Sequence, residues 1–263
     1  MKLSIVISVP DKNALAEQKQ FGNKIKKIAD LGYQGVELAI RDPKTINQSK
    51  LKKMLNELNL KVVSITTGQV FSKDKLSLSD KRIKNRRKAI QRIKNHISLA
   101  AIFKSQVLIG WVRGNWHGSE QSNLRFVKAL KECAKFAQKK GVILTLEPIN
   151  NAEIDCLHTI AETRKILEKI NLPNTGLIAD TYHMHLEEDK PIYQAIKEAK
   201  RYLKHVHLAD NDRLAPGQGH MPFQKFFAAL KKMNYRGWFS VEAFKPNFQT
   251  VAKLSINYLK KFI

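Results

Sequence analysis

Short apolar runs alternate along the chain with longer stretches whose apolar residues recur at helical spacing. This alternation is typical of βα units that build a parallel sheet. The apolar runs predict strands at residues 3–8, 35–40, 62–66, 106–110, 142–147, 176–180, 205–208 and 238–242. The stretches between them predict helices, among them 51–58, 124–139, 159–170, 193–203, 223–233 and 251–262.

Eight such units in 263 residues are typical of an α/β protein of the (β/α)8 TIM barrel class, which takes about 250 residues. Since no glycine- or proline-rich linker divides the chain, we expect residues 1–263 to form a single TIM barrel domain. Gly32, Gly141 and Gly237 are expected to end helices. The alternative is an open doubly wound sheet, but its usual glycine-rich phosphate turn is missing after Ser8.

The predicted compartment is the cytoplasm. Residues 1–11 indicate a first strand and not a signal peptide, and no apolar run approaches the roughly 18 residues of a membrane helix. Cys133 and Cys156 form no C-x-x-C pair, and so few thiols fit a reducing compartment. We therefore expect no membrane partner.

The net charge of +24 would suit a protein that binds nucleic acid. Many of the basic residues lie in helical stretches such as 81–94, where Ile83, Ala89, Ile90 and Ile93 are expected to form the buried stripe. We therefore interpret the charge as a solvated, lysine-rich exterior and expect no specific nucleic-acid partner. Apolar residues on the outer helices either pack inward or support a homo-oligomer.

Four polar residues come at the ends of four successive predicted strands. They are Glu147, Asp180, His207 and Glu242, and each closes an otherwise apolar run. In a barrel the chemistry collects at the carboxyl ends of the strands, so we expect these side chains to converge. An unpaired ion in a protein interior costs several kcal/mol, so something must compensate the carboxylates.

A divalent cation among the converging side chains would favour the ionised carboxylates. Three carboxylates and one imidazole form a hard ligand set without thiolate, which favours one Mn²⁺ or Co²⁺ ion and is also compatible with Mg²⁺ or Zn²⁺. Four protein ligands leave coordination positions for two substrate oxygens. For each residue taken alone, the alternative to a role as metal ligand is a structural one, as a cap at the strand end or a partner in a salt bridge.

Other polar residues lie near the same predicted strand ends. Arg213, in the loop 210–220, offers planar donors to a substrate, and Arg113 and Gln69 follow the fourth and third strands. His183 is expected in a loop, where it either faces a ligand or bonds the backbone. His205 is expected to point away from His207 and to be structural.

Several motifs resemble the xylose isomerase-like TIM barrel superfamily of sugar phosphate isomerases and epimerases. The nearest resemblance is to the ketose 3-epimerases, such as 5-keto-L-gluconate epimerase. The motifs, spread over nearly the whole chain, are Val-Glu-Leu-Ala-Ile-Arg-Asp-Pro from Val36, Thr-Gly-Gln from Thr67, Leu-Ser-Leu-Ser from Leu76, Leu-Ile-Gly-Trp-Val-Arg-Gly from Leu108, Leu-Glu-Pro-Ile-Asn from Leu146, Asp-Thr-Tyr-His-Met from Asp180 and Ala-Pro-Gly-Gln-Gly-His from Ala215.

The resemblance implies a role for each matching residue. The metal ligands would be Glu147, Asp180, His207 and Glu242, and the two glutamates would also exchange protons with the substrate. The substrate oxygens would bind Glu153, His183 and Arg213. The chain departs from the motifs of these families at residues 150–153, 184–188 and 222–223.

We therefore predict a metal-dependent isomerase of carbohydrate metabolism. It would invert the carbon next to the carbonyl of a keto-sugar or keto-sugar acid, through a metal-stabilised enediolate with two glutamates as acid and base. The same groups could return the proton to the adjacent carbon, which would give an aldose–ketose isomerase.

Two further readings come from other classes of protein. A DNA repair nuclease resembling endonuclease IV shares the barrel and would use three metal ions, with additional histidines after the second and third strands. Asp42-Pro43 and Gly68-Gln69 stand in those regions. An inert barrel is the other reading, and the complete ligand set argues against it.

Overall fold

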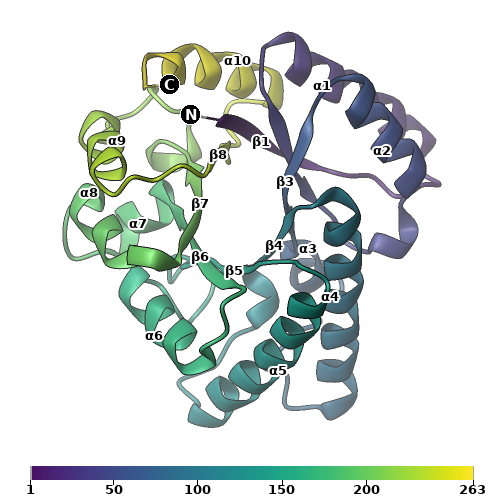
Figure 1. The fold of residues 1–263 in the computed structure, drawn as a ribbon, viewed down its shortest axis with the longest axis vertical. Helices are drawn as coiled ribbons and strands as arrows, with labels where there is room; N and C mark the ends of the chain where they lie inside the picture. The colour runs from purple at the N-terminus through teal and green to yellow at the C-terminus, as the bar shows by residue number, and fades with distance from the viewer. Residues whose placement is uncertain (1, 263) are drawn as a thin grey trace.

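The computed structural model describes residues 2–262 and shows a closed barrel of parallel strands (Figure 1). Met1 and Ile263, which the domain prediction includes, lie outside the described residues. The strands run in chain order around the barrel, and β8 closes it by pairing with β1. Within residues 2–262 the eight strands are β1 (Lys2–Ser8), β2 (Gly35–Ala39), β3 (Lys61–Thr66), β4 (Gln106–Ile109), β5 (Leu144–Leu146), β6 (Thr175–Asp180), β7 (Leu203–Leu208) and β8 (Trp238–Val241).

Helices surround the barrel on its outside, as Figure 1 shows. The predicted TIM barrel is therefore confirmed, and the open doubly wound sheet is excluded by the β1–β8 pairing. The α-helices in the described chain are α1 (Leu15–Asp30), α2 (Gln48–Glu57), α3 (Gly68–Ser72), α4 (Ile83–Phe103), α5 (Glu120–Lys139), α6 (Ile160–Ile170), α7 (Thr181–Glu187), α8 (Ile192–Ala195), α9 (Phe223–Lys232) and α10 (Phe248–Leu259).

The strands are almost completely buried because helices cover the outer face and side chains fill the inner face. Each residue of β2 and β6 is buried, and so are the three residues of β5. This two-sided burial explains why the strands are continuous apolar runs in the sequence. A polar residue within such a run therefore points either into the barrel or into the helical layer.

The helical layer follows the predicted pattern in α4. Ala89, Ile90 and Ile93 are buried and the lysines of this helix lie outside them. Ile83 is an error of the prediction, since it is 67% exposed at the first turn of the helix.

The prediction of a helix at 193–203 is wrong for the second half of this segment. The chain forms the short α8, then a 3₁₀ segment, Ile196–Tyr202, which contains Lys200 at φ 46° and ψ −133°. This left-handed residue breaks the helix just before β7 begins at Leu203.

The glycine expectations hold at two positions of three. Gly32 and Gly141 have positive φ (92° and 67°) after α1 and α5, as predicted. After α9 the left-handed residue is Asn234 (φ 54°) and not Gly237. Asparagine tolerates this conformation better than most other side chains do, which explains the difference.

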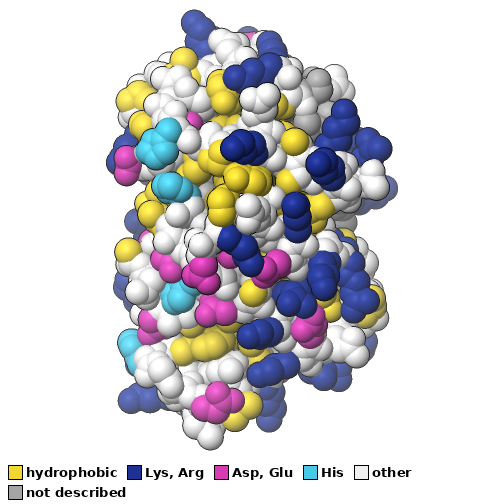
Figure 2. Space-filling model, turned by 90° about the vertical axis from the view of Figure 1, so that its left-hand side faces the viewer, with side chains coloured by type: hydrophobic (Ala, Val, Ile, Leu, Met, Phe, Trp, Pro, Cys, Tyr) yellow, Lys and Arg dark blue, Asp and Glu magenta, His cyan; other side chains and the backbone are white. Residues whose placement is uncertain are grey.

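The surface is mixed in charge despite the net charge of +24. On the face drawn in Figure 2, lysine and arginine side chains lie among acidic, histidine and apolar side chains. Among residues 2–262, no helix is long and apolar enough to cross a bilayer.

The buried aromatic side chains of α9 provide a test of the packing. Phe226 is completely buried and Gln224, on the same helix, is exposed. We expect Phe226→Ala to lower the free energy of unfolding by about 3–5 kcal/mol, because it removes apolar contacts and leaves a cavity. Urea denaturation measures this, with Gln224→Ala as the matched control. Equal stability of the two variants would contradict the packing.

Candidate functional site

Four functional side chains meet where β5 to β8 end. Asp180 is the last residue of β6, and His207 lies in β7 one residue before its end. Glu147 and Glu242 directly follow β5 and β8. One potential ligand atom from each of the four lies within 4.8 Å of the others. The structure thus brings together the four residues that the strand ends single out in the sequence.

His207 is at the centre of this cluster. Its Nδ1 atom lies 2.8 Å from Oε1 of Glu147, 3.0 Å from Oε2 of Glu242 and 3.8 Å from Oδ2 of Asp180. The side chains of His207 and Asp180 are completely buried, whereas that of Glu242 is 17% exposed. Glu147 and Glu242 also line the cavity at the barrel mouth. The two glutamates therefore face both the cluster and the cavity.

A second buried group lies beneath the cluster, inside the barrel. The carboxylate of Glu37, on β2, lies 3.1 Å from Nε2 of His207 and 2.9 Å from Nε2 of His205. Glu37 therefore orients the His207 ring so that Nδ1 faces the other carboxylates. The hydroxyl of Ser240 also lies 2.9 Å from Nε2 of His205.

The expectation that His205 points away from His207 is wrong. Residues two apart in a strand lie on the same face, and both rings point into the barrel with their centroids 5.2 Å apart. Sequence reasoning also missed Glu37. The available signal was a glutamate in the middle of a run, Gly35–Ala39, in which every residue is buried.

Arg213 enters the cluster from the loop after β7. Its Nη1 atom donates to Oδ2 of Asp180 (2.6 Å) and to Oε2 of Glu242 (3.3 Å), while Nη2 lies 2.8 Å from Nε2 of His183. The guanidinium carbon is 4.4 Å from the centre of the Tyr182 ring. Arg213 is therefore fixed by ion pairs and by an aromatic face.

The Arg213 loop is held by the buried carboxylate of Asp210. This carboxylate accepts hydrogen bonds from the backbone N–H groups of Asn211 (3.1 Å), Gly217 (2.8 Å) and Met221 (2.9 Å). Three bonds from one side chain tie both ends of the loop together. The loop thus presents Arg213 from a fixed backbone.

The other predicted contacts also surround the cavity. His183 is buried in α7, and not in a loop as expected, with Nδ1 2.8 Å from Nδ2 of Asn150. Glu153 accepts hydrogen bonds from Nδ2 of Asn150 (2.8 Å) and from Nε1 of Trp111 (3.1 Å). Gln69 lies in α3. All three predicted residues, His183, Glu153 and Gln69, line the cavity, which has a volume of about 440 Å³.

Arg113 has a different place from the one expected of a substrate contact. Its side chain is completely buried, with Nη1 donating to the carbonyl of Glu147 and Nη2 to the carbonyl of Leu157. It is absent from the residues that line the described cavity. Arg113 therefore supports the backbone at Glu147.

The electrostatics of the cluster follow from burial and from the crowding of like charges. Burial raises the pKa of Glu147, and burial also raises the pKa of Glu242, to about 7. Burial opposes ionisation of Asp180 too, but the adjacent Arg213 and the two nearby imidazoles together outweigh it and lower the pKa of this carboxyl. Burial disfavours the charged imidazole of His207, but Glu37 and the two glutamates raise its pKa well above the usual value.

The donor set fits a divalent cation. Oε1 of Glu147 and Nδ1 of His207 are buried and have no well-aligned hydrogen-bond partner in the described chain, although they lie 2.8 Å apart. Buried polar atoms normally have partners, so two neighbouring atoms that lack one fit a position where a ligand would bind. The guanidinium of Arg213 forms ion pairs with two of the three carboxylates, those of Asp180 and Glu242. The cluster thus retains the excess negative charge that a metal ion would balance.

Comparison with known sequences supports the same conclusion about the fold. A family described as "Xylose isomerase-like TIM barrel" matches residues 25–262 of the chain. An L-ribulose 3-epimerase from Methylomonas sp. (strain DH-1) is 31% identical over 220 residues, and the match covers 82% of this chain and 76% of that protein.

Solved structures show the same fold. A D-allulose 3-epimerase from Methylomonas sp., in complex with D-allulose, has a TM-score of 0.85 and 23% identity over 100% of this chain and 97% of that one. The 3-keto-D-glucoside 4-epimerase from E. coli has a TM-score of 0.81 and 22% identity, with 99% of both chains covered.

The role of Asp210 can be tested by amide hydrogen exchange. We expect Asp210→Ala to accelerate exchange at the N–H groups of Gly217 and Met221, because both lose their acceptor. A lost bond of about 1.4 kcal/mol corresponds to roughly tenfold faster exchange. Gln218→Ala, an exposed position in the same loop, is the control. Unchanged exchange in the Asp210 variant would show that other contacts hold the loop.

Proposed function

Because the chain belongs to the xylose isomerase-like TIM barrel family and is a carbohydrate isomerase, we propose that it is a metal-dependent epimerase of a keto-sugar or keto-sugar acid. The reaction would invert the carbon next to the carbonyl group. The observation that carries this proposal is the pair Glu147 and Glu242, which lie in one cluster with Asp180 and His207 and also line the cavity.

In this proposal the metal ligands are Glu147, Asp180, His207 and Glu242. Their oxygens and single imidazole favour Mn²⁺ or Co²⁺, with Mg²⁺ or Zn²⁺ compatible. A divalent ion held there would act as a Lewis acid for the carbonyl oxygen, which is worth several kcal/mol of charge stabilisation. Glu37 would support the site by fixing the ring of His207.

The acid and base of the reaction would be Glu147 and Glu242. These side chains come from β5 and β8, which are separated along the barrel by β6 and β7. One carboxylate would remove the α-proton and leave a planar enediolate, and the other would return a proton to the opposite face. Both carboxylates line the cavity, so both would reach a substrate bound there.

Substrate oxygens would be bound by His183, Arg213, Glu153 and Gln69, which surround the same cavity. Arg213 bonds two of the proposed metal ligands, so it would couple the position of the sugar to that of the carboxylates. We assign Arg113 a positioning role beneath Glu147 and no substrate contact.

The names of the relatives bear on the class of sugar. The relatives described above are named for L-ribulose, D-allulose and a 3-keto-D-glucoside, which are all keto-sugars or keto-glycosides. A keto-sugar is therefore the proposed substrate. Epimerisation and aldose–ketose isomerisation share the first step, in which the α-proton is removed. They differ in the second step, because isomerisation returns the proton to the adjacent carbon.

The proposed reaction is tested by exchange of the substrate's α-deuterium with solvent. With Mn²⁺ added, we expect Glu147→Gln and Glu242→Gln each to lose nearly all exchange on D-allulose or L-ribulose, because each variant removes a proposed metal ligand together with a proton-transfer group. Nuclear magnetic resonance follows the label, and Glu57→Gln, an exposed carboxylate, is the control. Retained exchange in both site variants would refute the assignment.

Metal content separates this proposal from the nuclease resemblance. We expect about one divalent ion per chain, whereas a nuclease resembling endonuclease IV would bind three. At the two places where that resemblance requires histidines, Asp42 forms an ion pair with Arg92 and Gln69 bonds Ser8. Elemental analysis after dialysis counts the ions, and a value near three would favour the nuclease.

The supporting role of Glu37 has a separate test. We expect Glu37→Gln to weaken Mn²⁺ binding by about 10–100-fold, because His207 loses the carboxylate that orients it. Isothermal titration calorimetry measures the affinity without any substrate. Unfolding of the metal-free variant shows whether the barrel is intact, and an unchanged affinity in a folded variant would sink the idea.

A further inference from the structure

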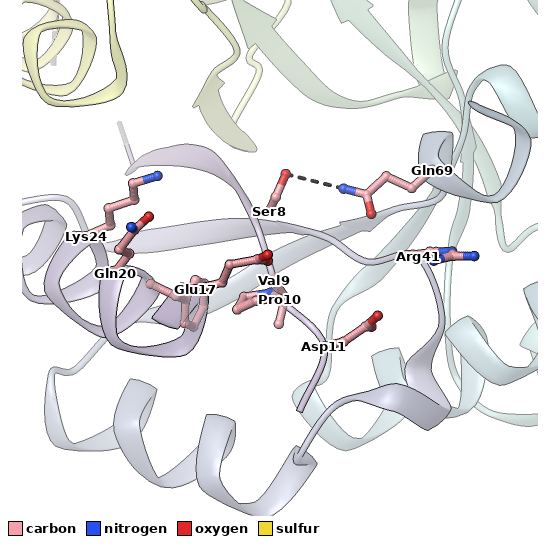
Figure 3. Close-up of a pocket in the computed structure, with 10 residues that line it drawn as sticks. Ser8, Val9, Pro10, Asp11, Glu17, Gln20, Lys24, Arg41 and Gln69 are labelled. Atoms are coloured by element: carbon pink, nitrogen blue, oxygen red, sulfur yellow. Dashed lines mark hydrogen bonds between the residues drawn. The ribbon is translucent and has the colours of Figure 1, made fainter. Parts of the chain in front are cut away.

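A second cavity adjoins the central one at the barrel mouth. It has a volume of about 290 Å³ and lies between the end of β1, the loop that follows it and helix α1. Ser8 and Gln69 line both this side cavity and the central cavity. Figure 3 shows the hydrogen bond between them, in which Nε2 of Gln69 donates to Oγ of Ser8 at 3.3 Å. The two cavities therefore meet at this pair.

The central cavity connects the acid–base pair with the side cavity. Glu147 and Glu242 contribute to its lining from the ends of β5 and β8, and Ser8 and Gln69 contribute from β1 and α3. A sugar with its reacting carbon at the glutamates extends away from them through this cavity. Any group attached to its far end that reaches Ser8 and Gln69 meets the side cavity.

The side cavity is lined by hydrogen-bonding groups of both kinds. Glu17, Gln20 and Lys24 project from α1, and Asp11 follows β1 (Figure 3). They offer carboxylate acceptors, an amide with both functions and an ammonium donor. The volume of about 290 Å³ is just below the roughly 300 Å³ at which ligand pockets usually start, so it suits one small unit.

The charges of the side cavity disfavour a phosphate. Arg41 forms an ion pair with Asp74 at 2.6 Å, and the hydroxyl of Thr45 donates to Asp11. Among the described residues that line the cavity, Lys24 is then the one basic side chain without a carboxylate partner, and it shares the cavity with Glu17. A dianion would face two carboxylates there, whereas hydroxyl groups can both donate to them and accept from Lys24.

We propose that the side cavity binds a neutral sugar unit linked to the far end of the keto-sugar, so that the substrate is a glycosylated keto-sugar. This inference rests on the proposed function for the identity of the reacting unit. The geometry points to Ser8 and Gln69 as the place where the linkage between the two units passes.

Three probes that differ only at carbon 6 test the proposal. They are D-fructose, 6-O-α-D-glucosyl-D-fructose and D-fructose 6-phosphate, each followed by exchange of its α-deuterium with Mn²⁺ present. We expect kcat/KM for the glucosyl compound to exceed that for D-fructose by about tenfold or more, because remote binding energy promotes the reaction. Equal values for these two sugars, or a preference for the phosphate, would overturn the inference.

A variant that fills the side cavity provides the matched comparison. Gln20→Trp places a large ring in the cavity, and Lys19→Trp adds the same ring one residue away at a position that does not line it. We expect Gln20→Trp alone to remove the advantage of the glucosyl compound while kcat/KM for D-fructose is unchanged. A loss of the same size in both variants would count against the side cavity.

A binding measurement separates failure of this inference from failure of the proposed function. If the chain exchanges the α-deuterium of none of the three probes, the proposed epimerase activity fails on these sugars. Saturation-transfer magnetic resonance with 6-O-α-D-glucosyl-D-fructose then shows whether the side cavity binds the glucosyl unit. Signals from the glucosyl protons with the natural chain, but not with Gln20→Trp, support the side cavity, and their absence with the natural chain overturns it.

Discussion

Three carboxylates held beside one imidazole at the end of a closed parallel barrel are the constraint on which the rest of the site depends. Glu147, Asp180 and Glu242 would repel each other in water, and burial adds a further cost to their charges. Asp180 is offset by Arg213, and the pKa of His207 is raised. Neither removes the excess of negative charge. The barrel tolerates this excess charge because the strands fix the side chains in place, and a cation bound among them would balance it.

The cluster is supported in two layers. Below it, Glu37 contacts His207 and His205, so the ring that faces the carboxylates is oriented from inside the barrel. Above it, the loop tied by Asp210 presents Arg213 to Asp180 and Glu242. A position fixed from both sides loses little entropy when a ligand binds, which is why such supporting residues matter as much as the ligands themselves.

The sequence contained most of the fold and the centre of the site, because strand runs and strand ends are local patterns. Glu147, Asp180, His207 and Glu242 each close an apolar run, and a barrel brings such ends together. How deep a side chain lies inside the barrel was harder to predict from the sequence. Arg113 follows a strand as Gln69 does, yet it turns beneath the site to bond backbone carbonyls. Which way a side chain turns after a strand depends on packing between distant segments, and no local pattern records this.

The charge of the whole chain and the charge of the barrel mouth have opposite signs, and this bears on the substrate. The net charge is +24, but carboxylates outnumber basic side chains around the two cavities. Five carboxylates line them, those of Asp11, Glu17, Glu147, Glu153 and Glu242, against the basic side chains of Lys24, Arg41 and Arg213. A polyanion attracted by the lysine-rich exterior would meet carboxylates at the mouth, where charges are least screened by water. A neutral sugar feels neither field strongly and can use the same carboxylates as hydrogen-bond acceptors. The long-range charge therefore says little about the chemistry, which is decided by groups within a few ångströms of the ligand.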